Sequence, residues 1–98
     1  MNVRILSVAE QEFSDAVSYY NDESPGLGFE FAAEVQATVE RIKNNPEAWT
    51  LLSCRTRRSL TNRFPFGIIY ELRQEEILIV SVMHLHRHPE SWTGRAND

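Results

Sequence analysis

The fold is decided by the stretch Arg63-Phe64-Pro65-Phe66-Gly67-Ile68-Ile69-Tyr70-Glu71-Leu72. Its large apolar residues at positions 64, 66, 68, 70 and 72 recur at every second position, which is the period of a strand with one buried face. The polar run Gln74-Glu75-Glu76 predicts a hairpin turn, and the nearly all-apolar run 77–83 predicts a second strand, covered on both faces. Pro65 inside the first strand indicates an edge or a bulge.

Upstream of this hairpin, an arginine-rich strand is expected from Cys54 to Leu60. Before this strand, the spacing of the apolar residues changes from two to the three or four residues typical of helices. Ser7 is expected to cap a first helix, with Glu10 completing a capping box, and this helix should run to about Asn21. Its predicted buried stripe has three- and four-residue spacing and consists of Ala9, Phe13, Ala16 and Tyr20.

A second helix is expected from about Phe29 to Asn44, after the tight turn Ser24-Pro25-Gly26-Leu27-Gly28. Its predicted apolar face consists of Leu27, Phe31, Val35, Val39 and Ile42. Together with a short strand at residues 3–6, the order is strand, helical hairpin, then three strands. This order predicts an α+β fold in which residues 1–98 form one domain, with the hairpin on one face of a small, twisted, mostly antiparallel sheet.

The composition is that of a soluble globular protein, with 42% apolar and 24% charged residues. The single cysteine, Cys54, allows no internal disulfide, and neither a signal-peptide pattern nor a membrane-length apolar run is present, so a cytoplasmic protein without membrane contact is expected. Residues 1–50 carry three basic and nine acidic groups, whereas residues 51–98 carry seven arginines and five acidic groups. The acidic balance of the whole chain argues against broad, salt-driven nucleic-acid binding.

Three histidines, His84, His86 and His88, are spaced two apart, which on a strand puts them on one face. Two of them could hold zinc, but no recognisable remote ligand accompanies them and nothing marks Cys54 as one. We therefore expect neither a metal nor a cofactor. Metal-free RNA cleavage is a second possibility, because His84 or His86 together with Arg58 and Arg87 could supply a base, a cation and an acid. The plainer interpretation is that one histidine caps the sheet and the arginines solvate its edge.

Four segments, in this order, resemble the RelE/ParE toxin superfamily: 16–20, 24–31, 57–70 and His84-Leu85-His86-Arg87-His88-Pro89-Glu90-Ser91-Trp92. The resemblance implies a helical hairpin against a small antiparallel sheet. It also implies the toxin of a type II toxin–antitoxin, or plasmid-stabilisation, module. The implied partner is a small antitoxin that wraps the toxin and binds operator DNA, so that the toxin meets DNA only indirectly.

Two branches of this superfamily act differently. RelE-like members cut messenger RNA on the ribosome, whereas ParE-like members inhibit DNA gyrase without cleaving nucleic acid. In this sequence the only lysine is Lys43, and Trp92 falls near the place of the C-terminal tyrosine of the nucleases. These departures favour the ParE-like branch.

Catalytic residues are assigned only for the nuclease alternative, as Arg58, His84, His86 and Arg87. Otherwise the candidates for contact with a target or antitoxin are Arg57, Arg58, Arg63, His86, Arg87 and Trp92. A third possibility is a homologue without toxicity that acts only in a repressor complex.

Overall fold

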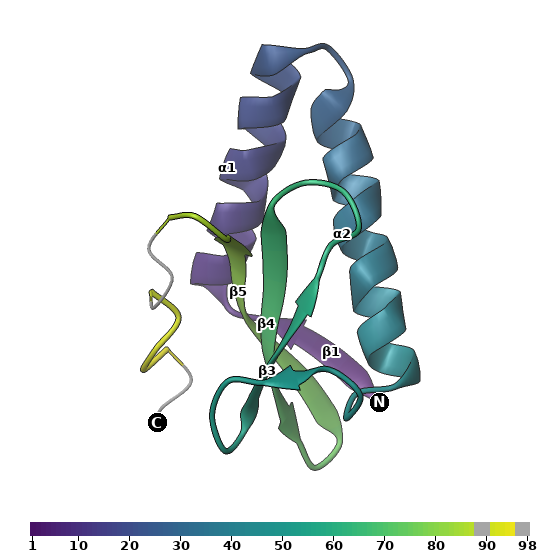
Figure 1. Ribbon diagram of the computed structural model, residues 1–98, viewed down its shortest axis with the longest axis vertical. Coiled ribbons are helices and arrows are strands. Elements are labelled where there is room, and N and C mark those ends of the chain that lie inside the picture. The colour runs from purple at the N-terminus through teal and green to yellow at the C-terminus, as the bar shows by residue number, and fades with distance from the viewer. Residues whose placement is uncertain (88–90, 96–98) are drawn as a thin grey trace.

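A computed structural model describes residues 1–87 and 91–95 of the chain (Figure 1). The elements are β1 (Asn2–Ile5), α1 (Ser7–Glu23), α2 (Leu27–Asn44), β2 (Thr50–Leu51), β3 (Thr56–Leu60), β4 (Phe66–Arg73) and β5 (Glu76–His84). The strands form one sheet in the order β1-β5-β4-β3-β2, in which only the β1–β5 pair is parallel. The predicted α+β fold is confirmed. The two-residue strand β2 was not predicted, and β3 begins at Thr56 rather than Cys54.

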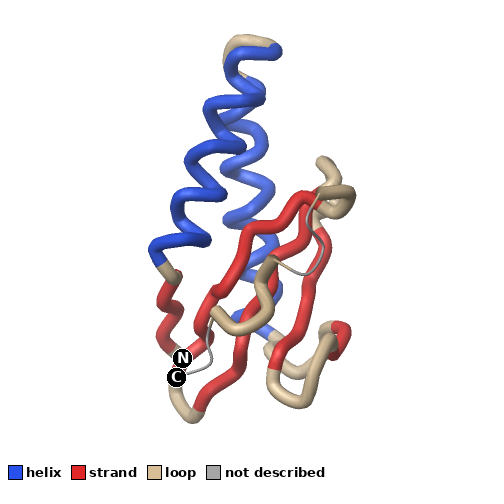
Figure 2. The backbone as a smooth tube through the Cα atoms, turned by 90° about the vertical axis from the view of Figure 1, so that its left-hand side faces the viewer, coloured by secondary structure: helices blue, strands red, loops and turns tan. Residues whose placement is uncertain are grey.

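The helical hairpin lies on one face of the sheet, and its tip extends past the end of the strands (Figures 1 and 2). Between the two layers lies a core that includes Phe31, Ile42, Phe66, Ile68 and Tyr70. A smaller cluster of Ile69, Leu78, Val80 and Met83 covers the other face of the sheet. The prediction that residues 77–83 are buried on both faces is therefore confirmed.

The predicted capping box at Ser7 is wrong. Ser7 is already the first residue of α1, and the residue in the N-cap position is Leu6, without a side-chain cap. The Leu6 N–H donates to the carbonyl of Ile79 at 3.0 Å, which ties this residue to β5, and the Glu10 N–H donates to the carbonyl of Leu6 at 2.9 Å. Leu6 is the single residue between β1 and α1. It therefore takes the N-cap position itself, and Ser7 falls inside the helix.

The hairpin turn lets the two helices approach closely at Gly28. A Cβ added there would lie 2.1 Å from the carbonyl oxygen of Val17, and the Gly28 N–H donates to Asn21 Oδ1 at 2.8 Å. Gly26, with φ 87°, precedes α2 in the left-handed conformation, and the Glu30 N–H donates to its carbonyl. The helix therefore starts at Leu27, two residues before the predicted start.

The strand β4 begins at Phe66 and not at Phe64, which is a correction to the predicted alternation. Phe64 has φ 69°, so the chain turns there before entering the strand. The expected bulge is not at Pro65. It lies farther along, where Ile69 pairs with Ser81 but Tyr70 pairs with Ile79, so Val80 is the extra residue. Among the described residues, neither helix has both the length and the apolar content to cross a membrane.

Candidate functional site

A groove of about 440 Å³ runs between α1 and the C-terminal end of β5, and we call it the α1–β5 groove. The residues that line it from α1 are Glu12, Asp15, Ala16, Tyr19 and Tyr20, whose spacing places them on one side of a helix. The strands contribute Phe66, Val82, Met83 and His84, and the segment after β5 contributes Arg87 and Ser91. The groove thus has an apolar floor with aromatic and charged side chains at its rims.

His84 ends β5 at the rim of this groove, with its ring 5.2 Å from Phe66 and 5.7 Å from His86. Its Nδ1 accepts a hydrogen bond from the His86 N–H at 3.1 Å, which selects the tautomer protonated at Nε2. Burial lowers the pKa of His84, and the nearby Arg87 and His86 lower it further. The imidazole is therefore neutral at pH 7.

His86 and Arg87 are both exposed, and the Arg87 guanidinium lies 6.0 Å from the centre of the Tyr19 ring. This distance is the outer limit of a cation–π contact. His88 lies outside the described residues. No group of three possible metal ligands occurs within residues 1–87 and 91–95.

Arg57 and Arg58 point to opposite faces of the sheet, as neighbours on a strand must. Arg57 donates to the carbonyls of Glu47 and Trp49, both at 2.9 Å, and so fastens the segment after α2 to the sheet. Arg58 lies on the face away from the helices, where its stem packs over Gly67, and its buried Nε has no hydrogen-bond partner among the described residues.

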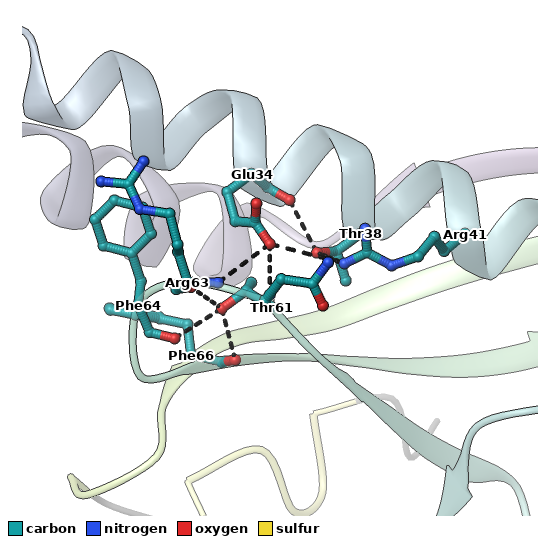
Figure 3. A network of polar contacts seen from close by, with 8 residues as sticks. Glu34, Thr38, Arg41, Thr61, Arg63, Phe64 and Phe66 are labelled. Carbon is teal, nitrogen blue, oxygen red and sulfur yellow. Dashed lines mark hydrogen bonds and ion pairs between the residues drawn. The ribbon is translucent and has the colours of Figure 1, made fainter.

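Arg63 lies in the loop between β3 and β4, which α2 holds in place (Figure 3). Its guanidinium forms an ion pair with Glu30 at 2.9 Å and lies 4.9 Å from the Phe64 ring. The Glu34 carboxylate accepts hydrogen bonds from the N–H groups of Asn62 and Arg63. Thr61 Oγ1 lies within hydrogen-bonding distance of three carbonyls of the same loop, those of Arg63, Phe64 and Phe66.

Beyond β5, Trp92 packs against the smaller hydrophobic cluster, so it docks this segment on the sheet. Arg95 reaches across the edge of β5 to α1. Its Nη1 and Nη2 lie 2.9 and 3.1 Å from the two carboxylate oxygens of Glu12, and Nη1 also donates to the carbonyl of Val80 at 3.0 Å. Arg95 is therefore held against both α1 and β5.

The structure brings His84, His86 and Arg87 together at the groove and keeps Arg58 apart from them on the other face of the sheet. It also adds four residues that sequence reasoning did not select as site residues, Glu12, Asp15, Tyr19 and Arg95. The spacing of the first three along one helix face was visible in the sequence. Nothing in the sequence pointed to the pairing of Arg95 with Glu12.

This arrangement of a helical hairpin on one face of a mostly antiparallel sheet also occurs in a solved structure. A solved structure described as the chromosomal ParDE toxin–antitoxin system from P. aeruginosa has a chain that superposes with a TM-score of 0.69. The match covers 86% of this chain and 95% of that chain at 15% sequence identity, a likeness of fold. No curated protein matches the sequence.

Residues 3–89 match the family described as ParE toxin of type II toxin–antitoxin system, parDE. The chain belongs to this family. The expectation that it falls in the ParE-like branch is confirmed.

Proposed function

We propose that this chain is the toxin of a type II toxin–antitoxin module, that it inhibits growth by binding DNA gyrase in the cytoplasm, and that a cognate antitoxin neutralises it. The observation that carries the proposal is the family match, which spans residues 3–89 and so nearly the whole chain.

The geometry supports binding rather than RNA cleavage. Arg58 lies on the face of the sheet opposite to the side where His84 meets Phe66. The Nδ1 atom of His84 already accepts a backbone hydrogen bond, and arginine stays protonated and cannot act as a general base. The four residues of the nuclease alternative therefore do not converge on one reacting atom.

For contact with gyrase we favour His86 and Arg87 among the six candidates. Both are exposed, Arg87 lines the groove and His86 lies next to His84, and neither forms an ion pair among the described residues. Arg57 and Trp92 are occupied in holding the fold together, and Arg63 is paired with Glu30. We therefore expect these three residues to stabilise the fold around the contact surface and not to contact gyrase themselves.

Inhibition of DNA supercoiling by purified gyrase tests the proposal. The chain should block supercoiling at stoichiometric excess, and the protein encoded by an adjacent gene should relieve the block. Arg87→Ala should weaken inhibition about tenfold, whereas Lys43→Ala, an exposed cation at the end of α2, should leave it unchanged.

Unimpeded supercoiling at excess toxin would refute gyrase as the target. If growth then stops and translated messages are cut, the chain is a ribosome-dependent endoribonuclease. If growth continues without the antitoxin, the chain is a non-toxic member of a repressor complex.

A further inference from the structure

The contact between Arg95 and Glu12 shows how α1 and the edge of β5 together bind an arginine beside the α1–β5 groove. The guanidinium pairs with a carboxylate of α1 through two nitrogens and donates to a backbone carbonyl at the open edge of β5. That edge is open because β1 pairs with β5 only as far as Ile79. Glu12 also accepts hydrogen bonds from Ser81 Oγ and the Val82 N–H, at 2.9 and 3.1 Å, so its Oε1 accepts three hydrogen bonds in all.

The same combination of groups recurs one helical turn farther along the groove. Asp15 follows Glu12 by three residues on the groove side of α1, and Val82 follows Val80 by two residues on β5. Since the Val82 N–H leaves the sheet ladder to meet Glu12, the Val82 carbonyl points to the same open edge. Asp15, Val82 and the half-exposed Tyr19 ring thus line the same groove, with the carboxylate on the helix side and the carbonyl on the strand side.

Unlike Glu12, Asp15 is exposed and forms no ion pair with any described residue. Its Oδ1 accepts one hydrogen bond, from the side-chain amide of Gln11 at 2.8 Å. The whole of α1 carries Glu10, Glu12, Asp15, Asp22 and Glu23 but no arginine or lysine. A partner that lies along this helix is therefore favoured when it is cationic.

We propose that this second position, formed by Asp15, Tyr19 and the edge of β5 at Val82, binds an arginine side chain of the cognate antitoxin. The proposal rests on the proposed function for the identity of the partner. Arginine fits better than lysine because its planar group can pair with a carboxylate, donate to a carbonyl and stack on a ring at the same time. Arg87 is exposed and lies at the outer limit of contact with Tyr19, so it makes no close contact with that ring.

The site can be tested first without the antitoxin, using N-acetyl-arginine amide as the probe. We expect its titration to shift the backbone amide NMR signals of Asp15, Tyr19 and Val82, whereas the uncharged analogue N-acetyl-citrulline amide should not. Asp15→Asn should weaken binding of the probe at least about fivefold. The matched control is Glu10→Gln, which removes the same charge from α1 outside the groove. Equal binding to both variants, or shifts centred elsewhere, would overturn the proposal.

The second test uses the protein encoded by the adjacent gene. Asp15→Asn should weaken its complex with the chain about tenfold, and Glu10→Gln should not. A protein that neutralises the chain but binds Asp15→Asn as tightly as the wild type would refute the arginine site while leaving the proposed function intact. If no adjacent protein binds, the proposed partner is wrong, and the probe titration alone still decides whether the groove receives arginine.

Discussion

Arg95 and Glu12, which are 83 positions apart in the sequence, form a two-pronged ion pair that joins the end of the described chain to the first helix. Only 16% of the Arg95 side chain and 27% of the Glu12 side chain are exposed. The same carboxylate accepts a hydrogen bond from the Val82 N–H at the edge of β5, beyond Ile79, where the pairing with β1 ends. The pair therefore closes an edge of the sheet and holds the segment that carries Trp92.

Removal of this pair should destabilise the fold. We expect Arg95→Ala to lower the free energy of unfolding by about 2 kcal/mol, because a charged hydrogen bond is lost and Glu12 is left partly buried without its cation. Urea denaturation measures the change, and a double-mutant cycle with Glu12→Gln should give a coupling of at least about 1 kcal/mol. The control is Arg4→Ala, which breaks a similar but more exposed pair with Glu76. Its cost should stay below about 1 kcal/mol. Equal costs for the two arginines would contradict this account.

Glu34 should hold the loop that carries Arg63 and Phe64 (Figure 3). Without its carboxylate, two backbone N–H groups lose their acceptor, and Arg41 loses an ion pair at 3.8 Å. Glu34→Ala is therefore expected to cost about 1–2 kcal/mol in urea denaturation. Glu40→Ala on the same helix breaks only an exposed pair with Lys43 and should cost less than about 0.5 kcal/mol. Similar losses for the two variants would show that the loop does not depend on Glu34.

The close approach of the helices predicts a large penalty for a single methyl group at Gly28. In Gly28→Ala the new Cβ would meet the Val17 carbonyl oxygen at 2.1 Å and Asn21 Cγ at 2.7 Å, so the helices must separate. We expect a loss of about 3 kcal/mol in thermal or urea unfolding. Gly26→Ala adds the same methyl group in open space and meets only the strain of its positive φ, about 1 kcal/mol. A smaller loss at Gly28 than at Gly26 would refute the packing argument.

The helices and strands could be predicted well where the spacing of apolar residues along the sequence determines them. Alternation placed Phe66, Ile68 and Tyr70 together on the core face of β4, and helical spacing identified most of the buried positions of both helices, although not Thr38. Prediction from the sequence failed where backbone geometry decides, as at Phe64 with its positive φ and at Ser7, which the short connection through Leu6 places inside the helix.

The candidate site was harder to predict than the fold, because side chains that are neighbours in the sequence lie on opposite faces of the sheet. Arg57 and Arg58 look like one cluster in the sequence, yet they point to opposite faces. The position of Arg95 depends on a contact between the two ends of the chain, for which no local pattern exists.

His84 should make the stability of the fold depend on pH. Its ring faces Phe66 of β4, His86 and Arg87 of the following segment, and, across the groove, Glu12, Asp15, Tyr19 and Tyr20 of α1. Burial and the neighbouring Arg87 lower its pKa below the ordinary value of 6.5, so the unfolded chain binds a proton at higher pH than the folded chain does. The stabilisation of the fold by neutral His84 is therefore fully present above about pH 6.5. It is lost as the pH falls from there through the lowered pKa of the folded state.

Protonation of Nδ1 would also break its hydrogen bond with the His86 N–H. NMR titration of the imidazole signals should find that His84 titrates below the ordinary histidine pKa of 6.5. Unfolding measured at pH 7.5 and pH 5 should show a smaller loss of stability for His84→Gln than for the wild type, while His86→Gln should keep most of the wild-type loss. An imidazole of His84 that titrates at or above pH 6.5 would contradict both its burial and the tautomer that its hydrogen bond selects.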